Sequence, residues 1–131
     1  MEVLRSDDPE FTVFGQTYIT TSYNGVVKAW HLHNIQKDVI CCVKGMIKLV
    51  TLKEIPGHIP IQFEVSELFI GEKNPCLVVI PPGIYHGWKA YDGDAIVMNT
   101  TDIPYNREKP DEWRKSVDYF NDVYKWGRVD K

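Results

Sequence analysis

The chain has 131 residues, of which 44% are hydrophobic and 25% are charged, a balance typical of one globular domain with an apolar core. Its 15 Lys and Arg against 18 Asp and Glu give a formal net charge of −3. Because no excess of cations is present to neutralise phosphates, nucleic acid is not an expected partner. The apolar runs are far shorter than the roughly 20 residues of a membrane span, so no membrane partner is expected either.

The cysteines and the N-terminal sequence bear on the compartment. Three Cys are present, and the adjacent pair Cys41 and Cys42 does not suit an ordinary disulfide, which favours reduced thiols. The first ten residues do not resemble a signal peptide. We therefore expect a cytoplasmic protein in which residues 1–131 form a single domain.

Short alternating or apolar segments, separated by turn residues, run through most of the chain. In chain order, strands are expected at residues 17–22, 26–33, 39–43, 46–52, 62–70, 77–80, 85–90 and 95–99. Tight turns are expected at Lys44-Gly45 and Asp92-Gly93. About eight strands at this spacing predict an all-β sandwich or barrel.

The C-terminal tail has a different pattern. The sequence allows two structures for this tail, a helix that begins at Pro110-Asp111 or an extended segment. In either case we expect the tail's aromatic residues to pack against the barrel or a second subunit. The residues at helical spacing are Trp113, Val117, Phe120 and Tyr124.

Three histidines lie in two informative places. His31 and His33 are two apart in an expected strand, so their side chains leave the same face. Asp38 follows them, and His86 follows the turn Pro81-Pro82-Gly83. These four side chains can converge inside a small barrel, where they would bind a divalent metal or act as a metal-free acid–base set.

The spacing of these residues resembles the two motifs of the cupin barrels. Gly25-x5-His31-x-His33-x4-Asp38-x6-Gly45 resembles the first motif, with Asp in place of the usual Glu, and Pro81-Pro82-Gly83-Ile84-Tyr85-His86 resembles the second. The resemblance implies a cupin fold, which is a double-stranded β-helix or jelly-roll barrel, here with a short C-terminal tail.

A narrower resemblance, over about residues 17–105, is to the dTDP-4-dehydrorhamnose 3,5-epimerase family. It lies in Asn24–His31, Val39–Gly45 (VICCVKG), Ile80–Trp88 (IPPGIYHGW) and Asn99–Asp102 (NTTD). Lys28–His33 is also similar to a strand of short sugar 3,4-ketoisomerases. The resemblance implies an isomerase in polysaccharide or antibiotic-sugar biosynthesis that acts on a dTDP-linked 4-keto sugar, without a cofactor and as a homodimer.

The resemblance also implies roles for individual residues. His31 matches the base that removes the proton beside the C4 ketone, and His86 matches a second active-site histidine. His33 and Asp38 complete the catalytic candidates. Lys28 stands where the family has a diphosphate-contacting Arg, although strand alternation places it opposite His31 unless a bulge intervenes. The substrate-binding candidates are Lys28, Trp30, Gln36, Trp88 and Tyr105, of which the two Trp either stack on the substrate or pack in the core.

Two departures from the family leave its other roles unfilled. The family's enolate-stabilising Lys aligns with Asp38, and its general-acid Tyr aligns with Met98, which cannot transfer a proton. In the family, the Asp that orients the base lies beyond the last residue of this chain. We interpret Asp38 as a possible replacement that hydrogen-bonds His31 or His33.

Two further functions stay open at this point. One is a metal-dependent cupin enzyme that uses His31, His33, Asp38 and His86 as ligands, and the other is a non-catalytic cupin that binds sugar nucleotides. The metal-free enzyme is favoured, because IPPGIYHGW resembles a branch of the family that works without a metal.

Overall fold

The computed structural model describes residues 2–127, which form seven β-strands, paired antiparallel throughout, and contain no helix. The all-β prediction is confirmed. No helix in this part of the chain is long and apolar enough to cross a membrane. The strands are β1 (Gln16–Ser22), β2 (Val27–Leu32), β3 (Asp38–Ile55), β4 (Gln62–Gly71), β5 (Val78–Ile80), β6 (Tyr85–Thr101) and β7 (Trp113–Arg114).

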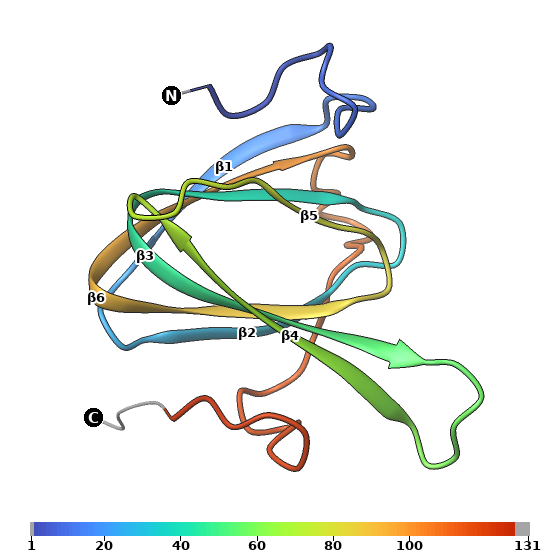
Figure 1. The fold of residues 1–131 in the computed structure, drawn as a ribbon. Coiled ribbons are helices and arrows are strands. Elements are labelled where there is room, and N and C mark those ends of the chain that lie inside the picture. The colour runs from blue at the N-terminus through green and yellow to red at the C-terminus, as the bar shows by residue number, and fades with distance from the viewer. Residues whose placement is uncertain (1, 128–131) are drawn as a thin grey trace.

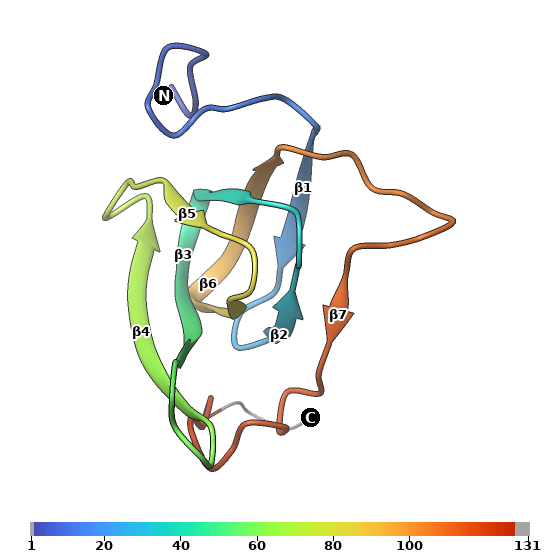
Figure 2. The ribbon, with the colours of Figure 1, turned by 90° about the vertical axis from the view of Figure 1, so that its right-hand side faces the viewer.

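The strands curve around a common centre, as Figures 1 and 2 show. Their order is β4-β3-β6-β2-β7, with β1 paired to β6 and β5 paired to β3. The two longest strands, β3 and β6, pair with each other along most of their lengths.

The expected turns at Lys44-Gly45 and Asp92-Gly93 are wrong. Both dipeptides lie inside continuous strands, β3 and β6, whose mutual register shifts between Cys42 and Met46. Bulges of this kind bend a strand and increase its twist, which lets two long strands follow the barrel without ending. A turn-forming dipeptide in the sequence therefore marks a bend here.

Two hydrophobic clusters lie on opposite faces of the same strands. Leu49 of β3 belongs to the first cluster and its neighbour Val50 belongs to the second, as the alternation of a strand requires. The first cluster contains Ile40, Cys42, Ile47, Leu49, Ile70, Ile80, Trp88, Ala90, Ala95 and Val97. The second contains Trp30, Val50, Leu52, Phe120 and Trp126.

The C-terminal segment is extended and then turns, so the helical alternative is wrong. Its backbone bonds join it to β2, because Trp30 and Lys115 exchange two N–H···O bonds of 3.0 Å. The strand β7 continues this pairing at His31 and Leu32. Beyond β7, Phe120 packs edge-on against the Trp30 ring at a centroid distance of 5.8 Å. The expected packing of tail aromatics against the barrel is confirmed for Phe120 and Tyr124, whereas Trp113 is 55% exposed.

Candidate active site

A cavity of about 1020 Å³ lies between β1, β2, β6 and the segment that leads into β7. Alternate residues of β1, Gln16, Tyr18 and Thr20, form one wall, and His31 and His33 of β2 form another. His86 of β6 also lines the cavity. The structure thus brings the three predicted histidines together, and Asp38 lies directly behind two of them.

The β2 strand carries a bulge between Lys28 and His31, where its register against β6 shifts. Without it, strand alternation would turn Lys28 away from the histidine side, but both residues line the cavity. The Lys28 ammonium donates a 2.9 Å hydrogen bond to the Thr21 carbonyl oxygen. Lys28 can therefore act on the same ligand as His31.

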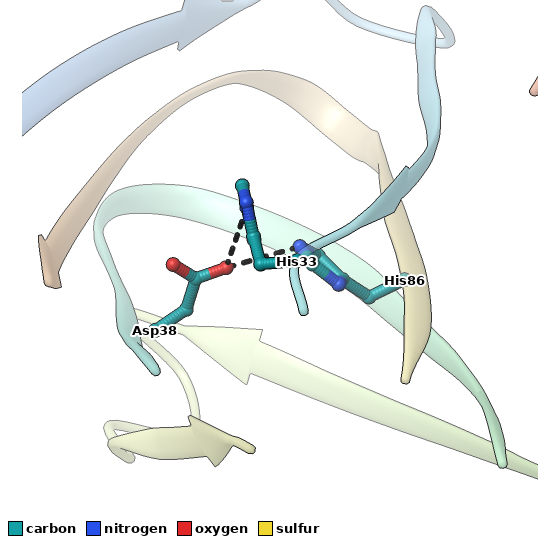
Figure 3. A group of neighbouring side chains, drawn as sticks. All are labelled: His33, Asp38 and His86. Atoms are coloured by element: carbon teal, nitrogen blue, oxygen red, sulfur yellow. Dashed lines mark ion pairs between the residues drawn. The ribbon is translucent and has the colours of Figure 1, made fainter. Parts of the chain in front are cut away.

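His33, Asp38 and His86 form a compact cluster (Figure 3). Asp38 Oδ2 lies 3.4 Å from His33 Nε2 and 3.2 Å from His86 Nε2. The other oxygen, Oδ1, accepts a 2.7 Å hydrogen bond from the Gln36 amide. Asp38 is 1% exposed, so both histidines share a carboxylate that water does not reach.

The charge of Asp38 depends on opposing effects. Burial raises the pKa of this carboxyl group, but the hydrogen bond and charge of His86, the Gln36 amide and the charge of His33 together hold the pKa below its ordinary value. Asp38 is therefore ionised at neutral pH.

His31 is paired with a different carboxylate. Its Nδ1 atom lies 3.6 Å from Glu112 Oε1, within ion-pair distance but beyond a hydrogen bond. Burial, and then the charge of His86, lower the pKa of His31 to about 4, although Glu112 acts in the opposite direction. The imidazole is thus neutral at neutral pH and can accept a proton. The interpretation that Asp38 hydrogen-bonds His31 is therefore wrong, because the carboxylate beside His31 is that of Glu112. Asp38 does lie beside His33, the other histidine named in that interpretation.

Asp111 holds the segment that carries Glu112 in place. Its carboxylate accepts 2.9 Å hydrogen bonds from the backbone N–H groups of Asn34, Ile35 and Gln36, and its carbonyl oxygen lies 2.5 Å from His33 Nδ1. Burial acts to raise the pKa of Asp111, but these three N–H donors outweigh it and lower the pKa. One residue thereby positions both the Glu112 carboxylate and the His33 ring.

Tyr18 presents a phenol to the cavity. Its hydroxyl oxygen accepts a 2.8 Å hydrogen bond from the Asn99 side-chain amide, so the phenol proton is available to another acceptor. Burial raises the pKa of Tyr18, with a smaller opposing effect from Asn99. The phenol therefore stays protonated at neutral pH, as a proton donor must.

Four of the five predicted substrate-binding residues line the cavity: Lys28, Gln36, Trp88 and Tyr105. The Trp88 ring is 6% exposed, and its N–H donates to Ser22 Oγ at 2.9 Å. The structure places Trp30 in the second hydrophobic cluster instead, 0% exposed, because adjacent strand residues point to opposite faces. Trp30 therefore packs in the core rather than against a substrate.

Sequence reasoning missed several cavity residues. Tyr18 and Thr20 alternate along the strand expected at residues 17–22, and this alternation could have indicated that Tyr18 faces the cavity. Nothing local in the sequence marked Glu112, and Trp113 was expected to pack rather than to line a cavity, since their position depends on the pairing of β7 with β2.

The fold and the site together define a small antiparallel-barrel enzyme with an acid–base cavity. No protein-family model matches the chain. It is 36% identical, over 129 residues, to the probable low-salt glycan biosynthesis epimerase Agl13 of Haloferax volcanii, a match that covers 96% of this chain and 82% of that protein.

Two solved structures are also similar. The dTDP sugar isomerase of Desulfovibrio desulfuricans has a TM-score of 0.86 and 27% identity, over 98% of this chain and 82% of the other. The dTDP-4-dehydrorhamnose 3,5-epimerase of Sulfolobus tokodaii has a TM-score of 0.75 and 27% identity, over 90% and 69%. The barrel is therefore a cupin, and the chain belongs to the dTDP-4-dehydrorhamnose 3,5-epimerase family of sugar epimerases and isomerases.

Proposed function

We propose that the protein is a nucleotide-sugar epimerase that moves a proton at the carbon beside the 4-keto group of a dTDP-linked deoxysugar, in polysaccharide or glycan biosynthesis. The observation that carries the proposal is the pair formed by His31 and Glu112 at the cavity wall. Similarity to a dTDP sugar isomerase and to a glycan biosynthesis epimerase supports the substrate class.

His31 acts as the base. Because its Nδ1 atom faces Glu112, Nε2 is the atom that takes the substrate proton. The C–H bond breaks, an N–H bond forms, and the electron pair moves onto the ketone oxygen as an enolate. Glu112 then stabilises the imidazolium that results, as a carboxylate partner does for a catalytic histidine.

Tyr18 acts as the acid on a second wall of the cavity. Epimerisation requires that the carbon regain a proton from the face opposite the one that lost it. Tyr18 is on β1, whereas His31 is on β2, and the Tyr18 hydroxyl already accepts from Asn99. Its O–H can therefore donate to the enolate carbon, after which solvent reprotonates the phenol. Tyr18 thus fills the role that Met98 cannot.

The cavity rim suits a nucleoside diphosphate. Four basic side chains line the cavity: Lys28, Lys109, Arg114 and Lys115. Two aromatic side chains, Tyr105 at 52% exposure and Trp113 at 55%, also line it and present faces on which a base can stack. Cations near the diphosphate and an aromatic ring near the base would bind the nucleotide while the sugar lies beside the histidines.

A 3,4-ketoisomerase is the second candidate, favoured by the similarity to the dTDP sugar isomerase of Desulfovibrio desulfuricans. In that reaction the proton moves between C3 and C4 through an enediol on one face, so an acid on the opposite wall is unnecessary. The position at which deuterium enters the product separates the two reactions.

The test is incubation with dTDP-4-keto-6-deoxyglucose in D2O, followed by NMR and mass spectrometry. The proposal expects deuterium at C3 or C5, or both, with the 4-keto group retained, whereas a ketoisomerase gives a 3-keto product. His31→Gln should slow incorporation by about 10²–10⁴-fold, the usual contribution of a general base. The matched control is His58→Gln, on an exposed loop, which should exchange at the wild-type rate. Exchange by His31→Gln at that rate would reject His31 as the base.

We also propose that the protein is a homodimer. Ile19 of β1 is 61% exposed, and the segment before it exposes Val13 at 60% and Phe14 at 61%. A second copy that covered this edge would bury all three side chains. Light scattering should give twice the chain mass, and a stable monomer at micromolar concentration would contradict the proposal.

The cytoplasm is the proposed compartment. Cys41 and Cys42 are buried thiols without a disulfide, and burial raises the pKa of both, which keeps them unreactive. Cell fractionation checks this location, and recovery of the protein outside the cytoplasmic fraction would overturn it.

A further inference from the structure

The Asn99 side chain is a buried amide in largely apolar surroundings. It is 2% exposed, on the face of β6 that lines the cavity, and it lies opposite Tyr18 of β1 and Ile40 of β3. Val97, two residues earlier on the same face, is 1% exposed and belongs to the first hydrophobic cluster. Burial of an amide costs free energy unless both its oxygen and its N–H groups find partners.

This requirement is met on one side of the amide only. Asn99 Nδ2 donates a 2.8 Å hydrogen bond to the Tyr18 hydroxyl oxygen, but Asn99 Oδ1 is buried without a hydrogen-bond partner among residues 2–127. Unpaired buried oxygens are uncommon in folded proteins, and each one calls for an explanation, of which a catalytic role is one. A leucine has nearly the same shape and would leave no polar group unpaired.

The orientation of the amide determines what the Tyr18 proton can do. If Oδ1 faced the phenol, it would accept the O–H group, and the proton would be held by Asn99. Because Nδ2 is there instead, the phenol oxygen accepts, and its O–H stays free for an acceptor in the cavity that Tyr18 lines. The observed orientation therefore favours proton donation by Tyr18 and leaves the Asn99 oxygen unpaired.

The same contact acts after the proton has left. When Tyr18 donates, its O–H bond breaks, the enolate electron pair forms the new C–H bond, and the phenol oxygen keeps the O–H electron pair as a phenolate. A phenolate oxygen only accepts hydrogen bonds, and an N–H donor stabilises it more than it stabilises the neutral phenol. The Asn99 N–H is already directed at this oxygen, so no side chain has to rotate when the charge develops.

The groups around Tyr18 make such a donor important. Burial raises the pKa of the phenol most, and the charges of Asp38 and Glu112 act in the same direction. The Asn99 hydrogen bond and the charge of Arg114 lower the pKa. Burial and two carboxylates thus oppose a phenolate, whereas the neutral Asn99 amide contacts the phenol oxygen and favours it.

From these contacts we propose that Asn99 is a positioning residue for the acid: its amide leaves the Tyr18 proton directed at the substrate and stabilises the phenolate that donation produces. The proposal rests on the proposed function, in which Tyr18 is the acid. It implies that the amide contributes to proton transfer and not to the stability of the fold.

The first test needs no substrate. A fluorotyrosine placed at position 18, which ionises at lower pH than tyrosine, is titrated by fluorine NMR in the otherwise wild-type chain and in Asn99→Leu. Because the variant removes a donor to the phenolate, the titration midpoint should move to higher pH. Asn121→Leu, at an exposed residue of the C-terminal segment, is the matched control and should leave the midpoint unchanged. A midpoint that stays in place or moves to lower pH in Asn99→Leu would overturn the proposal.

The second test is a double-mutant cycle on the epimerisation of dTDP-4-keto-6-deoxyglucose. Asn99→Leu should slow product formation by about 10-fold, roughly the equivalent of one hydrogen bond, and should have no further effect when Tyr18→Phe is already present. Its midpoint in urea denaturation should equal or exceed that of wild type, because an unpaired oxygen is removed. Equal slowing in both backgrounds, or a lower urea midpoint with an unchanged rate, would reject a role through Tyr18.

Asn99→Ala serves in both tests should Asn99→Leu fail to fold. A chain that does not process the sugar nucleotide would reject the proposed function, and the role of Asn99 with it. An active enzyme whose fluorine titration does not respond to the loss of the amide would reject the role of Asn99 alone. The two failures are therefore distinguishable.

Discussion

Trp30 and His31 are adjacent in β2 but belong to regions of opposite character. The Trp30 ring is fully buried among aromatic residues of the C-terminal segment, whereas His31 faces a cavity lined by ionisable groups. The apolar region stabilises the fold through area removed from water, and the cavity keeps each polar group beside a specific partner. Substitutions in the two regions should therefore have separable effects, on stability in one and on catalysis in the other.

The largest expected effect is on the apolar side. Trp30→Ala should lower the free energy of unfolding by about 3–5 kcal/mol, because it removes a large buried side chain and leaves a cavity. It also removes the hydrogen bond from the indole N–H to the Val117 carbonyl oxygen. Urea denaturation measures the change. Tyr23→Ala, at a residue 65% exposed, is the control that should stay within about 0.5 kcal/mol of wild type.

On the cavity side, Tyr18→Phe should leave unfolding nearly unchanged and slow epimerisation by about 100-fold, or roughly 2.7 kcal/mol in the barrier. The variant keeps the ring and removes the proton that the Asn99 contact leaves available. Deuterium wash-in and product formation should be measured separately, because proton removal by His31 can continue without the acid. Tyr23→Phe is the control. A Tyr18→Phe enzyme with full product formation would show that another group is the acid.

At Gly87, a single substitution should affect both stability and catalysis. A Cβ there would lie 2.4 Å from Ala29 Cβ and 2.8 Å from the Lys28 carbonyl oxygen, so β2 would have to move away from β6. Gly87→Ala should cost about 1–3 kcal/mol of stability and also reduce activity, since His31 and His86 face each other across this pairing. Ala29→Gly in the same chain removes the nearer contact and should restore part of both. If Ala29→Gly restores neither stability nor activity, the contact with Ala29 is not the cause of the loss, and the strands adjust in another way.

The smallest expected effect is at Glu112. Glu112→Gln keeps the shape of the side chain and removes the charge beside His31, so the rate should fall by about 10-fold, or roughly 1.4 kcal/mol, with stability unchanged. Steady-state kinetics should place the loss in kcat rather than KM. The exposed residue Glu108 provides the control, Glu108→Gln, which should behave as wild type. A loss confined to KM would assign Glu112 to substrate binding instead.

The local sequence pattern was sufficient to predict many of the strands and the histidines that line one side of the cavity. Strand alternation placed His31 and His33 on one face, and the Pro-Pro-Gly turn placed His86 beside them. It was not sufficient at Lys44-Gly45 and Asp92-Gly93, where the dipeptides bend long strands without ending them. A turn signal describes backbone conformation over a few residues and does not say whether the pairing continues on both sides.

The sequence by itself determined the all-β barrel, the resemblance to the epimerase family and three histidines that meet in one cavity. Only the tertiary structure decided which carboxylate each histidine received, Glu112 for His31 and Asp38 for His33 and His86. The reason is that Glu112 reaches β2 through contacts between residues far apart in the chain, such as the Asp111 carboxylate with the N–H groups of Asn34 and Ile35. Such contacts form only when the whole barrel closes, and no local periodicity encodes them.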